Sequence, residues 1–184
     1  MTMFLFHGKK GSGKTLNAVK CLYEKYKEGR TIYSNIHLNF PHKPITKEVL
    51  NEILKQNFLS EAVIFLDEVH TIVDCRRSMT GNSIKFGAFF TQSRKRNVDV
   101  IGTTQFIGQV DIRFRNNCDY FLEHKKIYID RKIQNPKFII LVSWFDNMYN
   151  YLKPTFIKSP SDYFNLYDTN QIIYYDWQDK KEKG

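Results

Sequence analysis

The feature that most constrains the fold of this chain is a glycine-rich loop near the amino terminus, where residues 8–15 read GKKGSGKT. This segment matches the pattern G-x-x-x-x-G-K-T in full, a loop whose backbone N–H groups surround phosphate oxygens at the start of a helix. The apolar residues 3–7 precede the loop, and residues 14–28 follow it with apolar side chains near helical spacing. A strand, a phosphate-binding loop and a helix in this order predict an α/β domain.

The side chains of the loop have separate expected roles in holding ATP. Its glycines let the backbone turn tightly, so that N–H groups point at phosphate oxygens. Lys14 is expected to reach the β- and γ-phosphates, and the Thr15 hydroxyl to ligate Mg²⁺. The residues predicted in this way to bind the cofactors ATP and Mg²⁺ are Gly8, Lys9, Lys10, Gly11, Ser12, Gly13, Lys14 and Thr15.

Lys9 leaves a second interpretation of the loop open. It stands five residues before Lys14, where dimerising ATPases with a deviant phosphate loop carry a lysine that reaches across the dimer. Those loops resemble K-G-G-x-x-K-T, and here Lys10 replaces the first of the two glycines. The match is partial, so a dimerising ATPase switch remains an alternative.

Two adjacent carboxylates follow a second apolar segment, where residues 62–68 read AVIFLDE. A continuous apolar run of this length predicts a strand buried on both faces. Asp67 is expected to hold Mg²⁺ through its water shell, and Glu68 to polarise the attacking water as a general base. A small-molecule kinase must exclude water and needs only the aspartate, so the pair favours ATP hydrolysis. His70 extends the run to DEVH, and a capping or packing role is expected for it.

Residues 89–105, FFTQSRKRNVDVIGTTQ, place a basic helix end before another buried strand. In a RecA-like sheet, a polar group at the tip of the strand beside the Asp67 strand lies near the γ-phosphate. Gln105 or Thr104 is therefore the candidate to orient the attacking water and report the nucleotide state.

Four arginines are candidates for an arginine finger that acts on a neighbouring subunit. Such a residue neutralises charge on the transferred phosphoryl group and accelerates the reaction by about 10³- to 10⁵-fold. Arg94 and Arg96 precede the strand just described, and Arg113 and Arg115 lie in the segment DIRFRNN. A surface or DNA-facing charge is the alternative for each of them.

The net charge of the chain is +9, and its three cysteines form neither a CxxC pair nor an even-numbered set. A basic balance favours polyanionic partners such as nucleic acid or an acidic membrane surface. The cysteine usage predicts a reducing compartment, the cytoplasm. The longest apolar run, residues 138–145, is well short of a membrane span, and the apolar start is too short for a signal peptide.

Strands are further expected over residues 31–38, 120–129 and 137–144, with helices over 46–57 and 84–94 and an irregular stretch at the end. Alternating strands and helices predict an α/β fold with a mostly parallel central sheet flanked by helices, as in RecA-like P-loop NTPases. At 184 residues we expect one such ATPase domain over residues 1–175, followed by a charged tail over 176–184. A helicase with two tandem motor domains is not expected at this length.

These segments resemble the FtsK/HerA superfamily, and within it viral genome-packaging ATPases and zonula-occludens-toxin-like assembly ATPases of filamentous phages. The resemblance spans roughly residues 1–172. It rests on GKKGSGKT, YSNI at residues 33–36, IFLDEVH, TQSRKRNVDVIGTTQ, DIRFRNNCDY and YDT at residues 167–169. The superfamily implies a homo-oligomeric ring, a hexamer or pentamer, that moves DNA by hydrolysing ATP.

The filamentous-phage type typically carries a transmembrane segment, which this sequence lacks. That difference favours packaging of double-stranded DNA into a capsid, at a site of virion assembly in the host cytoplasm and with a capsid vertex or portal protein as a further partner. Contacts to DNA would then be to phosphates and salt-sensitive; Arg76, Arg77 and Lys85 are the expected pore-facing residues. An assembly or secretion ATPase that acts on protein or on a single-stranded genome is the alternative.

Overall fold

The computed structural model describes residues 2–55, 59–73, 89, 97–129 and 137–168. The strands in this part of the chain are β1 (Met3–His7), β2 (Thr31–Ser34), β3 (Lys43–Pro44), β4 (Ala62–Leu66), β5 (Val98–Thr104), β6 (Tyr120–Tyr128), β7 (Phe138–Asp146) and β8 (Tyr151–Ile157). The helices are α1 (Lys14–Lys27), α2 (Lys47–Lys55) and α4 (Ile112–Asn117), with 3₁₀ turns η1 (Val69–Thr71), η4 (Ile107–Gln109) and η5 (Pro160–Leu166). The predictions for Arg94, Arg96, Arg76, Arg77, Lys85 and the tail over 176–184 fall outside the described residues.

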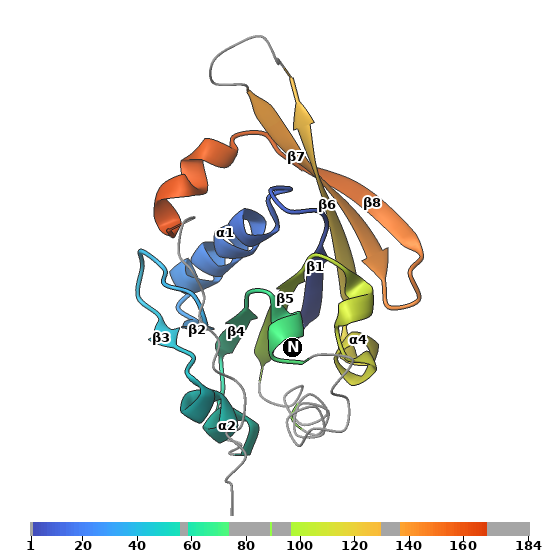
Figure 1. The fold of residues 1–184 in the computed structure, drawn as a ribbon. Helices are drawn as coiled ribbons and strands as arrows, with labels where there is room; N and C mark the ends of the chain where they lie inside the picture. The colour runs from blue at the N-terminus through green and yellow to red at the C-terminus, as the bar shows by residue number, and fades with distance from the viewer. Residues whose placement is uncertain (1, 56–58, 74–88, 90–96, 130–136, 169–184) are drawn as a thin grey trace, which may run out of the picture.

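The described strands form one sheet in the order β3-β2-β4-β5-β1-β6-β7-β8 (Figure 1). All neighbours from β3 to β6 are parallel, whereas β7 and β8 are added antiparallel at one edge. β5 lies between β1 and β4, and all three strands run in the same direction. The loop after β1 and the carboxylates after β4 therefore lie at the same ends of the strands, with the last residues of β5 between them. The predicted mostly parallel sheet is confirmed.

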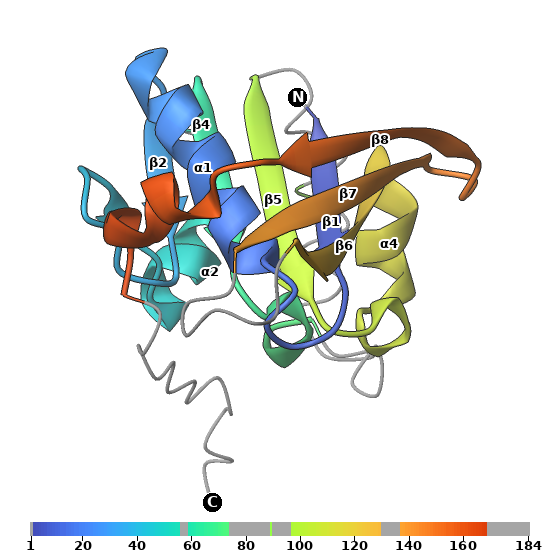
Figure 2. The same cartoon turned by 90° about the horizontal axis from the view of Figure 1, so that it is seen from above.

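Both faces of the parallel sheet are covered (Figure 2). On one face, Leu16, Val19 and Leu22 of α1 pack on alternate strand residues. On the other face, α2, η1 and α4 bury side chains such as Ile53 and Phe114. Strands of such a sheet need apolar side chains on both sides, which is why β4 has an unbroken apolar sequence.

Strand β2 ends earlier than predicted, at Ser34 rather than at residue 38. The Ser34 hydroxyl donates to the carbonyl of Ile36 at 2.8 Å and accepts from its N–H at 3.1 Å. A serine side chain that bonds to nearby backbone in this way competes with strand pairing and turns the chain. The turn places Asn35 at the edge of the sheet where the phosphate loop lies.

Strand β6 extends beyond its partner β1. The parallel pairing stops at His7 with Glu123, and β6 continues to Tyr128 paired only with β7.

The turn η5 packs back on α1, where the Lys20 ammonium lies 5.8 Å from the centre of the Tyr163 ring. In the part of the chain that the structure describes, no helix is long and apolar enough to cross a membrane.

Candidate active site

The phosphate loop is pressed against the β6–β7 hairpin, and two of its glycines are required there. Gly8 has φ +140°, and a Cβ on it would lie 2.5 Å from the carbonyl oxygen of His124. Gly13, which begins α1, has φ +93°, and a Cβ on it would lie 2.3 Å from Cδ1 of Ile140. Both positions therefore need glycine for its backbone conformation and for the space that a side chain would fill.

Lys14 and Ser12 present polar groups that suit phosphate oxygens. The Lys14 side chain is buried, and its ammonium donates to the carbonyl of Lys9 at 3.2 Å. Burial lowers its pKa, and the nearby charges of Glu68 and Asp67 act in the opposite direction. The Ser12 hydroxyl is buried and has no hydrogen-bond partner among the described residues. These groups fit a triphosphate bound in the loop, because its oxygens would accept from both.

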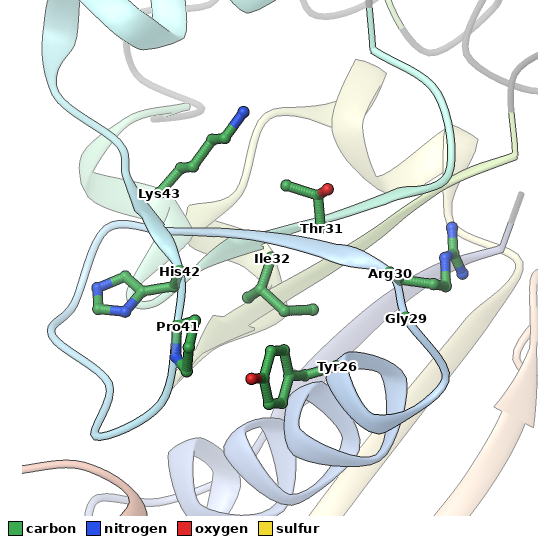
Figure 3. Close-up of a pocket in the computed structure, with 8 residues that line it drawn as sticks. All are labelled: Tyr26, Gly29, Arg30, Thr31, Ile32, Pro41, His42 and Lys43. Carbon is green, nitrogen blue, oxygen red and sulfur yellow. The ribbon is translucent and has the colours of Figure 1, made fainter.

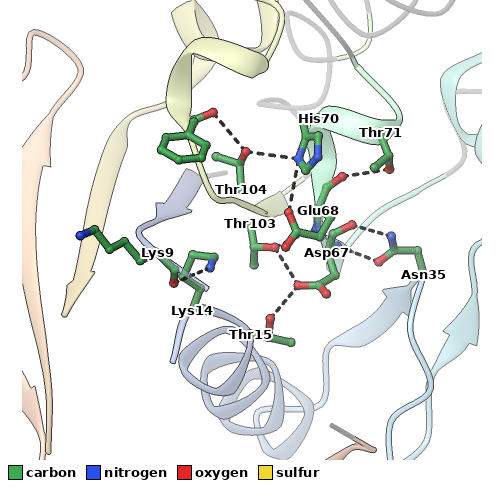
Figure 4. A network of polar contacts seen from close by, with 11 residues as sticks. Lys9, Lys14, Thr15, Asn35, Asp67, Glu68, His70, Thr71, Thr103 and Thr104 are labelled. Atoms are coloured by element: carbon green, nitrogen blue, oxygen red, sulfur yellow. Dashed lines mark hydrogen bonds and ion pairs between the residues drawn. The ribbon is translucent and has the colours of Figure 1, made fainter. Parts of the chain in front are cut away.

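The two predicted metal ligands lie in contact (Figure 4). The Thr15 hydroxyl donates to Oδ1 of Asp67 at 2.9 Å, and the Thr103 hydroxyl donates to the same oxygen at 2.7 Å. Burial raises the pKa of Asp67, while these two hydrogen bonds act to lower it. A carboxylate and a hydroxyl at one point suit Mg²⁺, which usually takes few protein ligands together with substrate phosphates.

Glu68 adopts a left-handed backbone conformation, with φ 49° and ψ 52°. Its Oε2 atom is buried and accepts no hydrogen bond from the described residues, and Nδ1 of His70 lies 3.3 Å away. The same Nδ1 atom lies 3.4 Å from the hydroxyl of Thr104, at the end of β5. His70, for which a capping or packing role was expected, therefore contacts both the candidate base and the tip of β5.

Two residues that the sequence analysis did not assign to the site contact the carboxylate pair directly. The Asn35 side chain bonds both backbone groups of Asp67, and Thr103 bonds Asp67 and the backbone of Glu68. Gln105 instead lies with the phosphate loop in the wall of a cavity. Asn35 and Gln105 follow the ends of β2 and β5, and Thr103 lies in the last residues of β5. Polar residues near strand ends in YSN and GTTQ were the available signal.

The cavity beside the phosphate loop has a volume of about 1010 Å³. One wall is the loop itself and the start of η4, and the other is the extension of β6. Lys9, Lys10, Lys125 and Lys126 make it basic, with Glu123 paired to Lys125 at 3.2 Å.

A buried histidine, His124, and a half-buried one, His7, lie next to the phosphate loop. Nε2 of His124 lies 2.9 Å from Nδ2 of Asn17 in α1, and its Nδ1 lies 2.9 Å from the carbonyl oxygen of Leu122. Since a carbonyl only accepts, Nδ1 carries the proton and Nε2 accepts from Asn17. Burial lowers the pKa of His124 to about 4, and that of His7 likewise to about 4. Both rings are neutral at physiological pH.

Tyr167, from the late YDT segment, also comes near the site. It forms an isolated bridge with Leu38, and burial raises its pKa to about 12, with the charge of Asp67 acting in the same direction.

The two candidate finger arginines of α4, Arg113 and Arg115, contact residues close to them in the chain. Nε of Arg115 donates to the carbonyl of Val110 at 3.0 Å, and Nη1 of Arg113 lies 3.8 Å from Oδ2 of Asp111.

A second cavity, of about 330 Å³, lies at the starts of β2 and β3, away from the phosphate loop (Figure 3). Arg30 in its wall donates to Asp99 and to the carbonyl groups of Ala62 and Asn97. Figure 3 shows its side chain turned away from Tyr26. Because Arg30 ties together the starts of β2, β4 and β5, its role there is structural, and this cavity is not the active site.

Solved structures of other proteins share this fold. The N-terminal domain of zonular occludens toxin from Neisseria meningitidis has a TM-score of 0.63 at 17% identity, covering 91% of this chain and 98% of that chain. The genome packaging NTPase B204 from Sulfolobus turreted icosahedral virus 2, in complex with ATP-γS, has a TM-score of 0.53 at 11% identity, covering 83% and 96%. The flagellar accessory protein FlaH from Methanocaldococcus jannaschii has a TM-score of 0.59 at 10% identity, covering 85% and 84%. No curated protein matches the sequence.

The complete phosphate loop, the carboxylate pair beside it and the shared fold define a P-loop NTPase with a RecA-like fold, as the sequence predicted. The chain belongs to the zonular occludens toxin (Zot) family, whose model matches residues 2–171. That family consists of P-loop NTPases, so the protein is an ATPase and a nucleotide-binding protein. The predicted resemblance to Zot-like ATPases is confirmed, whereas placement in the FtsK/HerA superfamily stays a prediction.

Proposed function

We propose that this ATPase is a motor of the FtsK/HerA superfamily that translocates double-stranded DNA and packages a viral genome into a capsid. The observation that carries the proposal is the carboxylate pair after β4. Asp67 is bonded to Thr15, while Glu68 beside it keeps a carboxylate oxygen that accepts no hydrogen bond from the described residues. The net charge of +9 and the likeness to B204, a genome packaging NTPase, support DNA as the polymer that is moved.

Each described residue of the site has one task in this scheme. Backbone N–H groups of residues 8–15 and the Lys14 ammonium would bind the phosphates. Thr15 and Asp67 would hold Mg²⁺, which supplies charge neutralisation on the phosphate oxygens. Glu68 would accept a proton from the attacking water. Gln105 or Thr104 would orient that water from the tip of β5.

A homo-oligomeric ring, hexamer or pentamer, would complete the site. Exposed apolar side chains gather at both ends of β6: Phe106, Ile127 and Tyr128 at the phosphate-loop cavity, and Met148 and Tyr149 at the β7–β8 turn. Two unlike patches on one chain favour a head-to-tail contact, which generates rings when the rotation closes. In such a ring, Arg94 or Arg96 of the neighbouring subunit would be the arginine finger that acts on the phosphates.

The remaining parts of the proposal follow from this role. A single domain over residues 1–175, with a charged tail over 176–184, would form each subunit. The motor would work in the host cytoplasm, where the described free cysteines Cys21 and Cys118 stay reduced. It would engage a capsid vertex or portal protein while its basic surface holds DNA.

A second function is favoured by the family match. The Zot model covers residues 2–171, and the fold covers 98% of the N-terminal domain of a zonular occludens toxin. An assembly or secretion ATPase of the filamentous-phage type, acting on protein or on a single-stranded genome, would use the same hydrolytic site. The two functions differ in the polymer that stimulates ATP turnover.

The steady-state ATPase rate, measured with double-stranded DNA, with circular single-stranded DNA and without DNA, separates these functions. Double-stranded DNA is expected to stimulate the wild-type rate, and the stimulation should fade between about 50 and 200 mM salt because phosphate contacts release counterions. Lys14→Ala is the control for contaminating activity. Stimulation by the single strand alone would favour the second function, and a DNA-independent rate would contradict the DNA motor.

A further inference from the structure

The peptide group that joins Asp67 to Glu68 is held on both of its sides by the strands that flank β4 (Figure 4). Its carbonyl oxygen accepts from Nδ2 of Asn35 at 2.9 Å. Its N–H donates to the hydroxyl oxygen of Thr103 at 2.9 Å. Asn35 follows β2 and Thr103 lies in β5, so one side chain from each neighbouring strand fixes the connection between the two carboxylates.

Asn35 is bonded to Asp67 twice. In addition to the bond from Nδ2, its Oδ1 accepts from the N–H of Asp67 at 2.7 Å. A side-chain amide offers the donor and the acceptor side by side that this pair of bonds requires, and an ionised carboxylate does not. An aspartate at position 35 would keep the acceptor, but it would lose the donor and place a third negative charge beside Asp67 and Glu68.

The held peptide precedes a residue in an uncommon conformation. Glu68 has φ 49°, a region that residues with a Cβ rarely adopt and that persists only where the surroundings enforce it. The peptide group that follows Glu68 is also bonded: its carbonyl oxygen accepts from the hydroxyl of Thr71 at 2.9 Å and from the N–H of Thr71 at 2.9 Å. Both peptides of Glu68 are therefore fixed by hydrogen bonds.

This conformation decides where the carboxylate of Glu68 points. Successive side chains of an extended strand point to opposite faces of a sheet. β4 ends at Leu66, and the left-handed turn at Glu68 leads into η1, so that the charges of both Asp67 and Glu68 act on the Lys14 ammonium. A change in this turn would move the Glu68 carboxylate away from the water it is proposed to activate.

We propose that Asn35 is a positioning residue for ATP hydrolysis, which, together with Thr103, locks the Asp67–Glu68 peptide so that Glu68 faces the attacking water while Asp67 faces the metal. This inference rests on the proposed role of Glu68 as the general base. Asn35 acts through the backbone of its neighbours and need not touch the nucleotide. Its loss should therefore reduce kcat and leave the KM for ATP nearly unchanged.

The test compares Asn35→Ala and the isosteric Asn35→Asp with wild type in steady-state ATPase assays, with ATP affinity measured separately using a fluorescent ATP analogue. We expect kcat to fall about 10- to 100-fold, the usual effect of removing a partner that orients a reactive group, with KM and affinity within about threefold. Asn39→Ala is the matched control, because its amide also donates to a backbone carbonyl, that of Asn165 at 2.7 Å, outside the site. The control should keep the wild-type kcat.

A double-mutant cycle separates positioning from a general structural role. In a Glu68→Gln background, adding Asn35→Ala, which brings no new charge, should leave the residual rate unchanged, because the group that Asn35 positions is already inactive. An equal loss in both backgrounds, or a wild-type kcat in the folded Asn35→Asp variant, would overturn the inference. If Glu68→Gln alone retained turnover, the base assignment itself would fail, and that outcome is distinct.

Discussion

Replacing Gly8 by alanine tests whether the phosphate loop is built against β6. The backbone of Gly8 has φ +140°, and an alanine Cβ would lie 2.5 Å from the carbonyl oxygen of His124, well inside normal contact. The unfavourable φ costs about 1–2 kcal/mol, and overpacking against a backbone atom costs about 1–3 kcal/mol. The expected loss is about 2–5 kcal/mol, a large part of the roughly 5–15 kcal/mol that stabilises a typical domain.

Urea unfolding of Gly8→Ala beside two control variants measures this loss. Gly29 also has a positive φ, of +86°, but a Cβ on it would meet no atom within 4 Å. Gly29→Ala should therefore show only the cost of the backbone conformation. Gly108→Ala, where a Cβ again meets nothing within 4 Å, should stay within about 0.5 kcal/mol of wild type. If Gly8→Ala lost no more stability than Gly29→Ala, the close approach of the loop to His124 would be refuted.

Other predictions concern the chemistry of the site. Glu68→Gln should bind ATP with wild-type affinity and lose hydrolysis, since the amide cannot accept the proton; substantial turnover in a single-turnover assay would remove Glu68 as the base. Mixing Arg94→Ala subunits with Lys14→Ala subunits should restore part of the ATPase rate if the finger acts in trans, and a mixture with no activity would deny Arg94 that role. Stability should fall as the pH drops from about 6.5 towards 4, because the unfolded state takes up protons on His7 and His124 that the folded state, with both pKa values at about 4, does not. The loss of stability should reach roughly 1–2 kcal/mol per histidine at pH 5. Urea unfolding at about pH 7 and pH 5 measures it, and the stability of His124→Gln should change less between these two pH values than that of the wild type.

Much of the sheet could be predicted from short-range pattern alone. The apolar runs at residues 3–7, 62–66 and 98–103 are strands because a parallel sheet buries both of its faces. The two strands expected over 120–129 and 137–144 are present as β6 and β7. Strand β8 was not predicted, because it is mostly exposed and contains Pro154, so its sequence lacks the alternation that marks a half-buried strand.

Some residues of the candidate site could also be predicted from short-range motifs, and others could not. Lys14, Thr15, Asp67 and Glu68 could be predicted because phosphate binding and metal binding require particular residue types at a fixed spacing after a strand, whatever the rest of the chain does; their roles stay predictions. The placement of Gln105 in the cavity wall agrees with the predicted position of the β5 tip near the loop, while its role stays a prediction. Arg94 and Arg96 also stay predictions, since they lie outside the described residues.

The sequence by itself determined the chemistry of this protein: a loop that binds phosphates, two acids beside it and a parallel sheet that brings them to one edge. Only the tertiary structure decided which residues hold that chemistry in place. Asn35 reaches Asp67 across 32 positions of the chain, and Asn17 reaches His124 across 107. The physical reason is that short-range patterns report local backbone preference and burial, whereas a hydrogen bond between segments far apart in the chain exists only once the order and register of the strands bring them together.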